Sequence, residues 1–290
     1  MDDHGRRHVG GSVMNLFQYA DYTALHGDLK VAQSRCQTRR INHIHNELKP
    51  SLLTFYVTSM ARLFPSRTKW VRPTPATWGV LNKMVGKLTS NLMCSCSILP
   101  YVMGLSPYKT PNEQLLEMWA HKEGKGKEWE GNESTHFGNV LEPVVLTEGC
   151  NRLGLIPELD ITEPVVHPTL PLAASLDGRA DGKSMTVHHD PSKGIYVVGN
   201  DRIVLDGIGV LESKVTRSRP EDFPPMWRGP VQVQGQMMCG GYKWAALIIL
   251  YGGVEMRIFL FTLHAGTEKS ITEACLDLDR RLNADEIEYY

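Results

Sequence analysis

Residues 208–214 read Ile-Gly-Val-Leu-Glu-Ser-Lys, an apolar run that ends in an acid and a base. The apolar start predicts a strand, and side chains two positions apart on a strand point to the same face. We therefore expect Glu212 and Lys214 to project together. With a second carboxylate from a neighbouring strand, for which Asp177 is the candidate, they would form an oxygen site for a hard divalent ion beside an ammonium group. Such a site is typical of phosphodiester hydrolysis.

The composition is that of a globular chain that can bury a large core. The 290 residues are 42% apolar with a formal net charge of −1, which excludes a globally basic nucleic-acid binder. A local basic groove around an acidic centre is compatible with this neutrality. No apolar run reaches about 18 residues, and residues 1–11 are polar, so we expect a soluble, intracellular protein with no membrane partner. The pattern does not distinguish nucleus from cytoplasm.

The cysteines and histidines do not form a metal-binding pattern. Of six cysteines, only Cys94 and Cys96 are close in sequence, and no second pair lies nearby. This spacing argues against a zinc or iron–sulfur site and predicts reduced cysteines in the core. His188 and His189 are interpreted as turn residues rather than ligands.

The chain divides at a basic, proline-containing segment, residues 65–73, which is interpreted as a linker. Apolar residues before it recur at helix-like spacings. We therefore expect an N-terminal helical extension of unknown function over 1–75 and a main domain over 76–290. The main domain should begin with an amphipathic helix, because apolar side chains recur every four residues at Val80, Met84, Leu88 and Leu92.

Two further helices are expected before the first strands. Thr110-Pro111-Asn112-Glu113 combines a capping threonine, a proline at the first helical position and a glutamate placed for a capping box. After a loop rich in glycine and lysine, a helix should place Phe137, Leu141 and Val145 on one face, with Glu142 beside that face.

After Gly149 the pattern changes to short apolar runs separated by proline and glycine, which predicts strands. Residues 199–201, Gly-Asn-Asp, are expected to form a hairpin turn between two of them. A helix over 231–239 would carry Gln232 and Gln236 on one face, and a last helix is expected over 271–282. The expected strands cover residues 172–176, 185–188, 195–198, 203–205, 208–212, 247–251 and 256–263.

The order of these motifs resembles the YqaJ-type viral recombinase and lambda-type exonuclease branch of the PD-(D/E)xK nucleases. The resemblance covers residues 88–282, and each motif alone is weak. The segments that carry it are Ser97, Gly-Leu-Ser-Pro-Tyr at 104–108, residues 113–119, Gly-Asn-Val-Leu-Glu-Pro at 138–143, Ala-Ser-Leu-Asp-Gly at 174–178, Leu-Glu-Ser-Lys at 211–214, and Val-Gln-Val-Gln-Gly-Gln-Met at 231–237.

The resemblance implies an α/β (α+β) fold with a restriction-endonuclease-like core, a central mixed β-sheet flanked by helices. It also implies Mg²⁺-dependent hydrolysis of DNA, with Mn²⁺ as a substitute. Asp177, Glu212 and the carbonyl of Ser213 would bind the metal, and Glu142 would contact it directly or through water. Lys214 would orient or deprotonate the attacking water.

Further residues match positions that surround the reaction. Gln232 would assist Lys214, and Ser97 and Ser175 would hold a backbone phosphate. Gln236, Lys87 and Arg217 are additional candidates for contacts with DNA. Plainer interpretations remain open for all of them: a surface ion pair for Glu-x-Lys, a turn for Asp-Gly, a polar helix face for the glutamines, and helix caps or buried hydroxyls for the serines.

The sequence also departs from the family pattern. Leu176 replaces the proline before the aspartate, and Val-Thr at 215–216 replaces a common cysteine-proline. Neither change removes a ligand. The long interval between Asp177 and Glu212 is expected to contain an inserted hairpin at 183–205.

The favoured function is a 5′-to-3′ exonuclease on linear double-stranded DNA, used in recombination, repair or viral genome processing. An endonuclease of the same fold and a non-catalytic DNA-binding or recombination-assembly module are the alternatives. By analogy, a single-strand annealing protein is a candidate partner and a homotrimer a candidate assembly. Tyr108 and Trp227 could stack on bases at a DNA end, or Tyr108 could pack under the adjacent helix.

Overall fold

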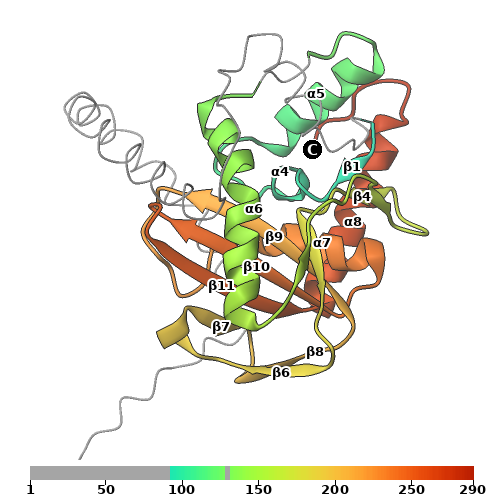
Figure 1. The fold of residues 1–290 in the computed structure, drawn as a ribbon. Coiled ribbons are helices and arrows are strands. Elements are labelled where there is room, and N and C mark those ends of the chain that lie inside the picture. The colour runs from blue at the N-terminus through green and yellow to red at the C-terminus, as the bar shows by residue number, and fades with distance from the viewer. Residues whose placement is uncertain (1–91, 128–130) are drawn as a thin grey trace, which may run out of the picture. The chain divides into compact units, whose positions relative to one another are not determined.

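Strand β9, Ile208–Thr216, lies inside a six-stranded mixed sheet in this computed structural model, which describes residues 92–127 and 131–290 (Figure 1). It pairs in parallel with β10 and antiparallel with β5. The strand order is β2-β5-β9-β10-β11-β7. The other members are β2 (Pro157–Glu158), β5 (Gly178–Asp181), β10 (Trp244–Tyr251), β11 (Glu255–Thr262) and β7 (Ile195–Val197).

Helices cover both faces of this sheet, so its inner strands are apolar along almost their whole length. Side chains of β10 point alternately to the two faces of the sheet. On one face, Leu247 and Ile249 pack with α7 (Pro230–Gly240) and α8 (Ala265–Leu282). On the other face, Ala246 and Ile248 pack with α6 (Glu133–Leu153). Figure 1 shows α6 on one side of the sheet and α7 and α8 on the other. The expected central mixed sheet flanked by helices is confirmed.

Helix α6 is buried along only part of its predicted apolar face. Asn132 caps its start by accepting the amide N–H of Thr135, and Gly154 ends it with a left-handed conformation. Phe137 is 53% exposed, whereas Val145 is 1% exposed. Phe137 and Val145 lie on one helix at a spacing that places them on the same face, as expected, but only the later half of α6 packs on β9 and β10, so the face is buried only there.

The start of helix α5 agrees with the prediction, whereas the start of helix α8 does not. Helix α5, Pro111–Lys122, begins with the expected capping box between Thr110 and Glu113 and follows the short helix α4, Leu99–Val102. Helix α8 begins six residues before the expected position. His264 caps it by accepting the amide N–H of Thr267, although histidine is not among the residue types most preferred at this position.

The inserted segment 183–205 contains an antiparallel strand pair, as expected, but the hairpin turn predicted at 199–201 is wrong, because the strands on its two sides do not pair with each other. Strand β6, Met185–His188, pairs antiparallel with β8, Arg202–Leu205, in a separate two-stranded sheet. Strand β7 instead joins the large sheet beside β11, because Ile195 and Val197 are buried in the cluster on the α6 side. The turn at 199–201 thus connects two sheets. His188 lies in β6 and is not a turn residue.

A small three-stranded sheet stands beside the large one. Its order is β1-β4-β3, from β1 (Cys94–Ser95), β4 (Leu172–Ala174) and β3 (Val165–Val166). Strands β1 and β4 are parallel, with Ser95 opposite Ala173. Two 3-10 turns complete the described elements, η3 (Pro191–Lys193) and η4 (Met226–Arg228).

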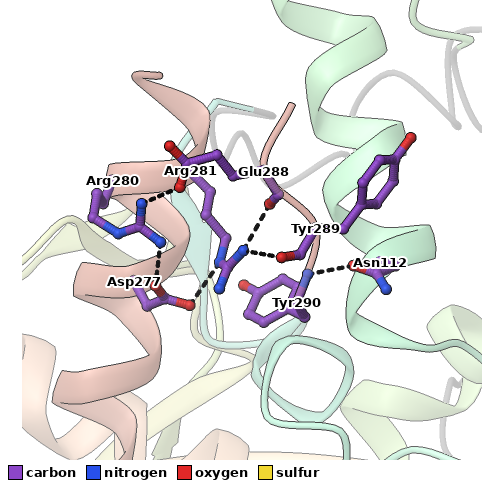
Figure 2. Close-up of polar contacts among 7 residues, drawn as sticks. All are labelled: Asn112, Asp277, Arg280, Arg281, Glu288, Tyr289 and Tyr290. Atoms are coloured by element: carbon purple, nitrogen blue, oxygen red, sulfur yellow. Dashed lines mark hydrogen bonds and ion pairs between the residues drawn. The ribbon is translucent and has the colours of Figure 1, made fainter. Parts of the chain in front are cut away.

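The last residues of the chain lie between α8 and α5, as Figure 2 shows. Arg281 donates to the carbonyl oxygens of Glu288 and Tyr289, and its guanidinium lies 4.2 Å from the centre of the Tyr290 ring. The amide N–H of Tyr290 donates to Asn112 Oδ1 on α5 at 2.7 Å. These contacts join the two helices through the C-terminal segment.

Several expectations concern residues outside the described ranges. These are the extension over 1–75, Cys36, Lys87 and the helix over 77–92 apart from Leu92, which lies exposed in a turn. All described residues belong to one compact unit, Val85–Tyr290. The five cysteines within it are buried and form no disulfide, as expected. None of the described helices has both the length and the apolar character needed to cross a bilayer.

Candidate active site

The pairing of β5 with β9 brings the two predicted acids together. Gly178 lies opposite Leu211 in this antiparallel pair, so the next position along each strand is Asp177 on one and Glu212 on the other. The amide N–H of Ser213 donates to Asp177 Oδ2 at 3.0 Å, and the Ser213 hydroxyl lies 3.4 Å from the same oxygen. These contacts fix the Asp177 carboxylate against β9.

The Glu212 carboxylate is buried and surrounded by donors. Lys214 Nζ lies 2.5 Å from Oε1, which also accepts from Gln232 Nε2 at 2.7 Å. Gln236 Nε2 donates to Oε2 at 2.7 Å. Glu212 is 1% exposed, whereas the Lys214 side chain is 32% exposed and reaches the surface. The strand therefore places an acid inside and its lysine partner at the rim.

Burial and the neighbouring carboxylate change the acid–base properties of this pair. Desolvation and the charge of Asp177 raise the pKa of Glu212 to about 7, although Lys214 and Gln236 act in the opposite direction. For Lys214, desolvation favours the neutral amine, but Glu212, Asp177 and Glu142 outweigh it and raise its pKa. Lys214 therefore keeps its proton at neutral pH.

Helix α6 supplies Glu142 to this region. Glu142 lies one helical turn before Val145 and Leu146, which pack in the same cluster as Leu211 of β9. Its charge contributes to the raised pKa of Lys214. The structure thus brings Glu142 into electrostatic contact with the lysine.

The predicted serines lie on another side of Glu212, at the ends of β1 and β4. Strands β1 and β4 pair in parallel with Ser95 opposite Ala173; Ser97 follows the end of β1 by two residues and Ser175 directly follows β4. Ser97 is exposed, and its hydroxyl lies 3.0 Å from that of Ser95. Gln236 Nε2 also lies 3.4 Å from the carbonyl oxygen of Ser175, which connects Ser175 to the Glu212 carboxylate through Gln236.

Two buried polar atoms in this region have no hydrogen-bond partner among the described residues: Ser175 Oγ and Gln236 Oε1. Buried polar groups normally form a hydrogen bond. Two such atoms without a partner beside a carboxylate therefore indicate a place for a ligand or an ordered water molecule. Gln236 itself is 0% exposed, which puts it behind Glu212 and away from the surface.

The remaining predicted residues are more distant from the carboxylates or fall outside the described ranges. Arg217 follows the last residue of β9 and is exposed. Gln234, on the same helix as Gln232, has a structural role: its amide donates to the Thr262 carbonyl and accepts the His264 amide N–H. Sequence reasoning missed Ser95 and the contact of Gln236 with Glu212. The spacing of Gln232 and Gln236 by four residues was the signal for the latter.

The donor set fits a hard cation that needs few protein ligands. Within residues 92–127 and 131–290, no group of three or more His, Cys, Asp or Glu side chains could hold a metal ion. Glu142 therefore does not complete a three-carboxylate cluster with Asp177 and Glu212. Magnesium is commonly bound by one or two carboxylates together with water and substrate phosphates, so the Asp177–Glu212 pair suits it. A cation would also offset the like charges that raise the pKa of Glu212.

The sheet and its motifs define the class of protein. Asp177 precedes β5, and Glu212-Ser213-Lys214 lies in the adjacent β9 of a mixed sheet flanked by helices, as expected. The profile of the YqaJ-like viral recombinase domain matches residues 91–243, just over half of the chain. The chain belongs to this family, and the predicted YqaJ-type branch is confirmed.

The chain is also similar to solved structures that include exonucleases by their descriptions. LHK-Exo, an alkaline exonuclease from Laribacter hongkongensis, is 17% identical over 71% of this chain and 94% of its own, with a TM-score of 0.45. The same enzyme in complex with dAMP gives 18% identity, 66% and 91% coverage, and a TM-score of 0.44. A phage-related exonuclease from Haemophilus somnus 129PT gives 14% identity, 65% and 94% coverage, and a TM-score of 0.44. No curated protein sequence matches this chain.

Proposed function

We propose that this protein is a metal-dependent deoxyribonuclease that hydrolyses phosphodiester bonds, acting as a 5′-to-3′ exonuclease on linear double-stranded DNA. The observation that carries the proposal is the buried Glu212, held by Lys214, Gln232 and Gln236 directly beside Asp177. Membership of a viral recombinase family supports DNA as the substrate. Removal of one strand from an end supplies the single strands that recombination and viral genome processing need.

In this proposal Mg²⁺, for which Mn²⁺ would substitute, would be held by Asp177, Glu212 and the backbone carbonyl of Ser213. Glu142 would interact with it through water, since it does not join the two acids in one cluster of the described residues. When bound, the cation would lower the pKa of a water molecule and offset the charge that develops on the phosphate.

The protonation state of Lys214 determines which role it can have in hydrolysis. A raised pKa keeps Lys214 positively charged at neutral pH, so it orients the attacking water and stabilises negative charge on the phosphate rather than removing a proton. Its partial exposure lets the ammonium group face the substrate side. Gln232 shares Oε1 of Glu212 with it and holds that oxygen in place when Lys214 turns to the substrate.

The residues around this centre position the acid and the DNA. Gln236 is buried and donates to Glu212, so it acts as a positioning residue rather than as a contact to DNA. We propose that the exposed Ser97 donates to a backbone phosphate and that Ser175, whose buried hydroxyl has no hydrogen-bond partner among the described residues, does so as well. Arg217, and Lys87 from outside the described residues, would add phosphate contacts farther along the strand.

Degradation of end-labelled linear duplex, compared with covalently closed circular DNA, tests the proposal. We expect Mg²⁺-dependent loss of the linear substrate alone, abolished by EDTA and by Lys214→Ala or Asp177→Ala. Cutting of closed circles would show an endonuclease instead. DNA retention without any product under any divalent ion would indicate a non-catalytic binding or assembly module.

The same proposal includes the division of the chain into domains and the identity of its partners. Residues 76–290 would form the nuclease domain, and residues 1–75 an extension whose function the sequence does not indicate. A homotrimer and a single-strand annealing protein as partner are proposed by analogy with lambda-type enzymes. Sedimentation analysis of the full chain tests the first of these.

A further inference from the structure

An exposed tyrosine, Tyr108, packs against a half-buried tryptophan, Trp227. Tyr108, in the loop between α4 and α5, is 75% exposed, and its ring meets Trp227 of η4 edge-on, with 5.2 Å between ring centroids. The guanidinium of Arg228 lies 4.7 Å from the centre of the Trp227 ring. These three side chains, Tyr108, Trp227 and Arg228, are called the aromatic platform below.

Hydrogen bonds to neighbouring residues hold the aromatic platform in place. Arg228 donates to Glu221 Oε2 at 2.6 Å and to the Ser218 hydroxyl at 2.8 Å, and its side chain is only 12% exposed. The amide N–H of Tyr108 donates to the hydroxyl of the buried Ser106 at 3.1 Å. Because its supports are fixed, the exposed face of Tyr108 is available without a conformational cost to prepare it.

Two chain connections keep the platform close to the carboxylates. Trp227 precedes Gln232 by five residues, a stretch that spans at most about 18 Å, and Gln232 donates to Glu212. Arg228 contacts Ser218, whose amide N–H donates to the hydroxyl of Thr216, two residues after Lys214. Successive bases along a strand of duplex DNA are about 3.4 Å apart, so the platform lies within a few nucleotides of the reaction centre.

Unpaired cationic groups stand beside the platform. Arg217 and Arg219 flank Ser218, both are exposed, and neither makes a hydrogen bond or an ion pair within the described part of the chain. Exposed aromatic rings next to free guanidinium groups are the combination that binds single-stranded nucleic acid, because rings stack on bases while cations contact phosphates. The combination of rings and cations therefore favours a nucleic acid as the partner.

We propose that Tyr108, supported by Trp227 and Arg228, stacks on an unpaired nucleobase of the DNA within a few nucleotides of the scissile phosphate. This inference rests on the proposed nuclease function and adds a preference to it: a frayed or single-stranded end binds better than a fully paired one. Arg217 and Arg219 contact the phosphates of the same strand.

Equilibrium binding in EDTA tests stacking without any hydrolysis. The probe is a duplex with a short single-stranded overhang that carries 2-aminopurine, whose fluorescence falls on stacking, and a matched overhang in which each base is replaced by an abasic site. We expect Tyr108→Ala to weaken binding of the normal overhang about tenfold, within the range for loss of one stacked base, and to abolish the fluorescence change. The abasic overhang should bind wild type and variant equally.

Two controls separate stacking from other effects. Tyr108→Phe keeps the ring and should restore both affinity and quenching. Tyr289→Ala removes another exposed tyrosine, 58% exposed in the C-terminal segment, and should change neither. Equal losses on normal and abasic DNA, or unchanged binding by Tyr108→Ala, would overturn the proposal. If that variant changed only the sedimentation of the protein, the platform would be a contact between proteins and the proposal would also be wrong.

The same samples in Mg²⁺ distinguish failure of this inference from failure of the proposed function. Hydrolysis by wild type together with unaltered DNA binding by Tyr108→Ala would reject the platform and retain the nuclease. Base-dependent binding without hydrolysis would retain the platform and reject the nuclease. With both activities present, Tyr108→Ala should raise KM more than it lowers kcat.

Discussion

Lys214 forms an ion pair with Glu212 of its own strand, with 2.5 Å between Nζ and Oε1. The two residues are neighbours on one face, yet one is buried and the other reaches solvent. The lysine therefore serves two needs. It offsets the charge of a desolvated carboxylate, and it presents an ammonium group at the rim where a phosphate would lie.

Replacing Lys214 by alanine should affect chemistry more than folding. We expect hydrolysis to fall at least about 100-fold, because charge stabilisation at the phosphate is lost. The free energy of unfolding at pH 8 should fall by about 2 kcal/mol, less than for a fully buried pair because Lys214 is partly exposed. Nuclease assays and urea unfolding measure the two effects.

Lys243 provides the matched control for that variant. It pairs with Asp206, but both side chains are well exposed. Lys243→Ala should leave hydrolysis unchanged and alter the unfolding free energy by less than about 1 kcal/mol. Equal losses of activity in the two lysine variants would contradict a specific role for Lys214.

Ionisation of Glu212 should make stability depend on pH. Its folded-state pKa of about 7 lies above the ordinary value of 4.5, so the folded protein binds this proton more tightly than the unfolded chain does. The associated stability is fully present below pH 4.5 and is lost as the pH rises through about 7. At 1.36 kcal/mol per pKa unit, the loss is about 3 kcal/mol at most.

Comparison with Glu212→Gln isolates this contribution, since glutamine cannot ionise and the other titrating groups are common to both proteins. In EDTA, the unfolding free energy of the variant relative to wild type should increase between pH 4.5 and 8. A difference between the two proteins that does not vary with pH would contradict the raised pKa.

Helix α7 offers two glutamines with different expected roles. Gln236→Leu removes a donor to Glu212, and we expect hydrolysis to fall about tenfold because a hydrogen bond to a charged group contributes about 1.5–3 kcal/mol. Gln234→Leu removes contacts to Thr262 and His264 only, so it should lower stability while leaving the turnover of folded enzyme unchanged. Similar turnover in both variants would remove the positioning role of Gln236.

The sequence was sufficient for the parts of the structure that depend on local patterns. The capping box fixed the start of α5, and period-two alternation put Glu212 and Lys214 together. Pairing between distant segments was not predictable from such patterns. Strand β7 leaves its chain neighbour β8 for β11 because its buried face matches the core near α6, a tertiary effect that a turn sequence does not contain.

Prediction of the candidate site from the sequence was limited in the same way. Residue types and order identified the acids, the lysine and the glutamine face, but not which atoms meet. That Gln236 lies behind Glu212, and not at the surface, depends on how α7 packs against β9. The exposure of Phe137 similarly depends on where the sheet ends under α6 and not on the helical period.

Two glycines of α6 test how tightly this helix must approach the sheet to position Glu142. A Cβ on Gly149 would lie 2.5 Å from Ile248 Cδ1 and 2.9 Å from its Cγ2, in the buried contact with β10. Gly149→Ala should therefore destabilise the fold by about 1–3 kcal/mol and lower hydrolysis, because α6 must shift with Glu142 on it. A Cβ on Gly138 meets nothing within 4 Å, so Gly138→Ala should stabilise by roughly 0.5–1 kcal/mol through helix propensity. Urea unfolding and nuclease assays of both variants measure the difference in stability and in hydrolysis. A Gly149→Ala protein as stable and active as Gly138→Ala would mean that close contact between α6 and β10 does not set the position of Glu142.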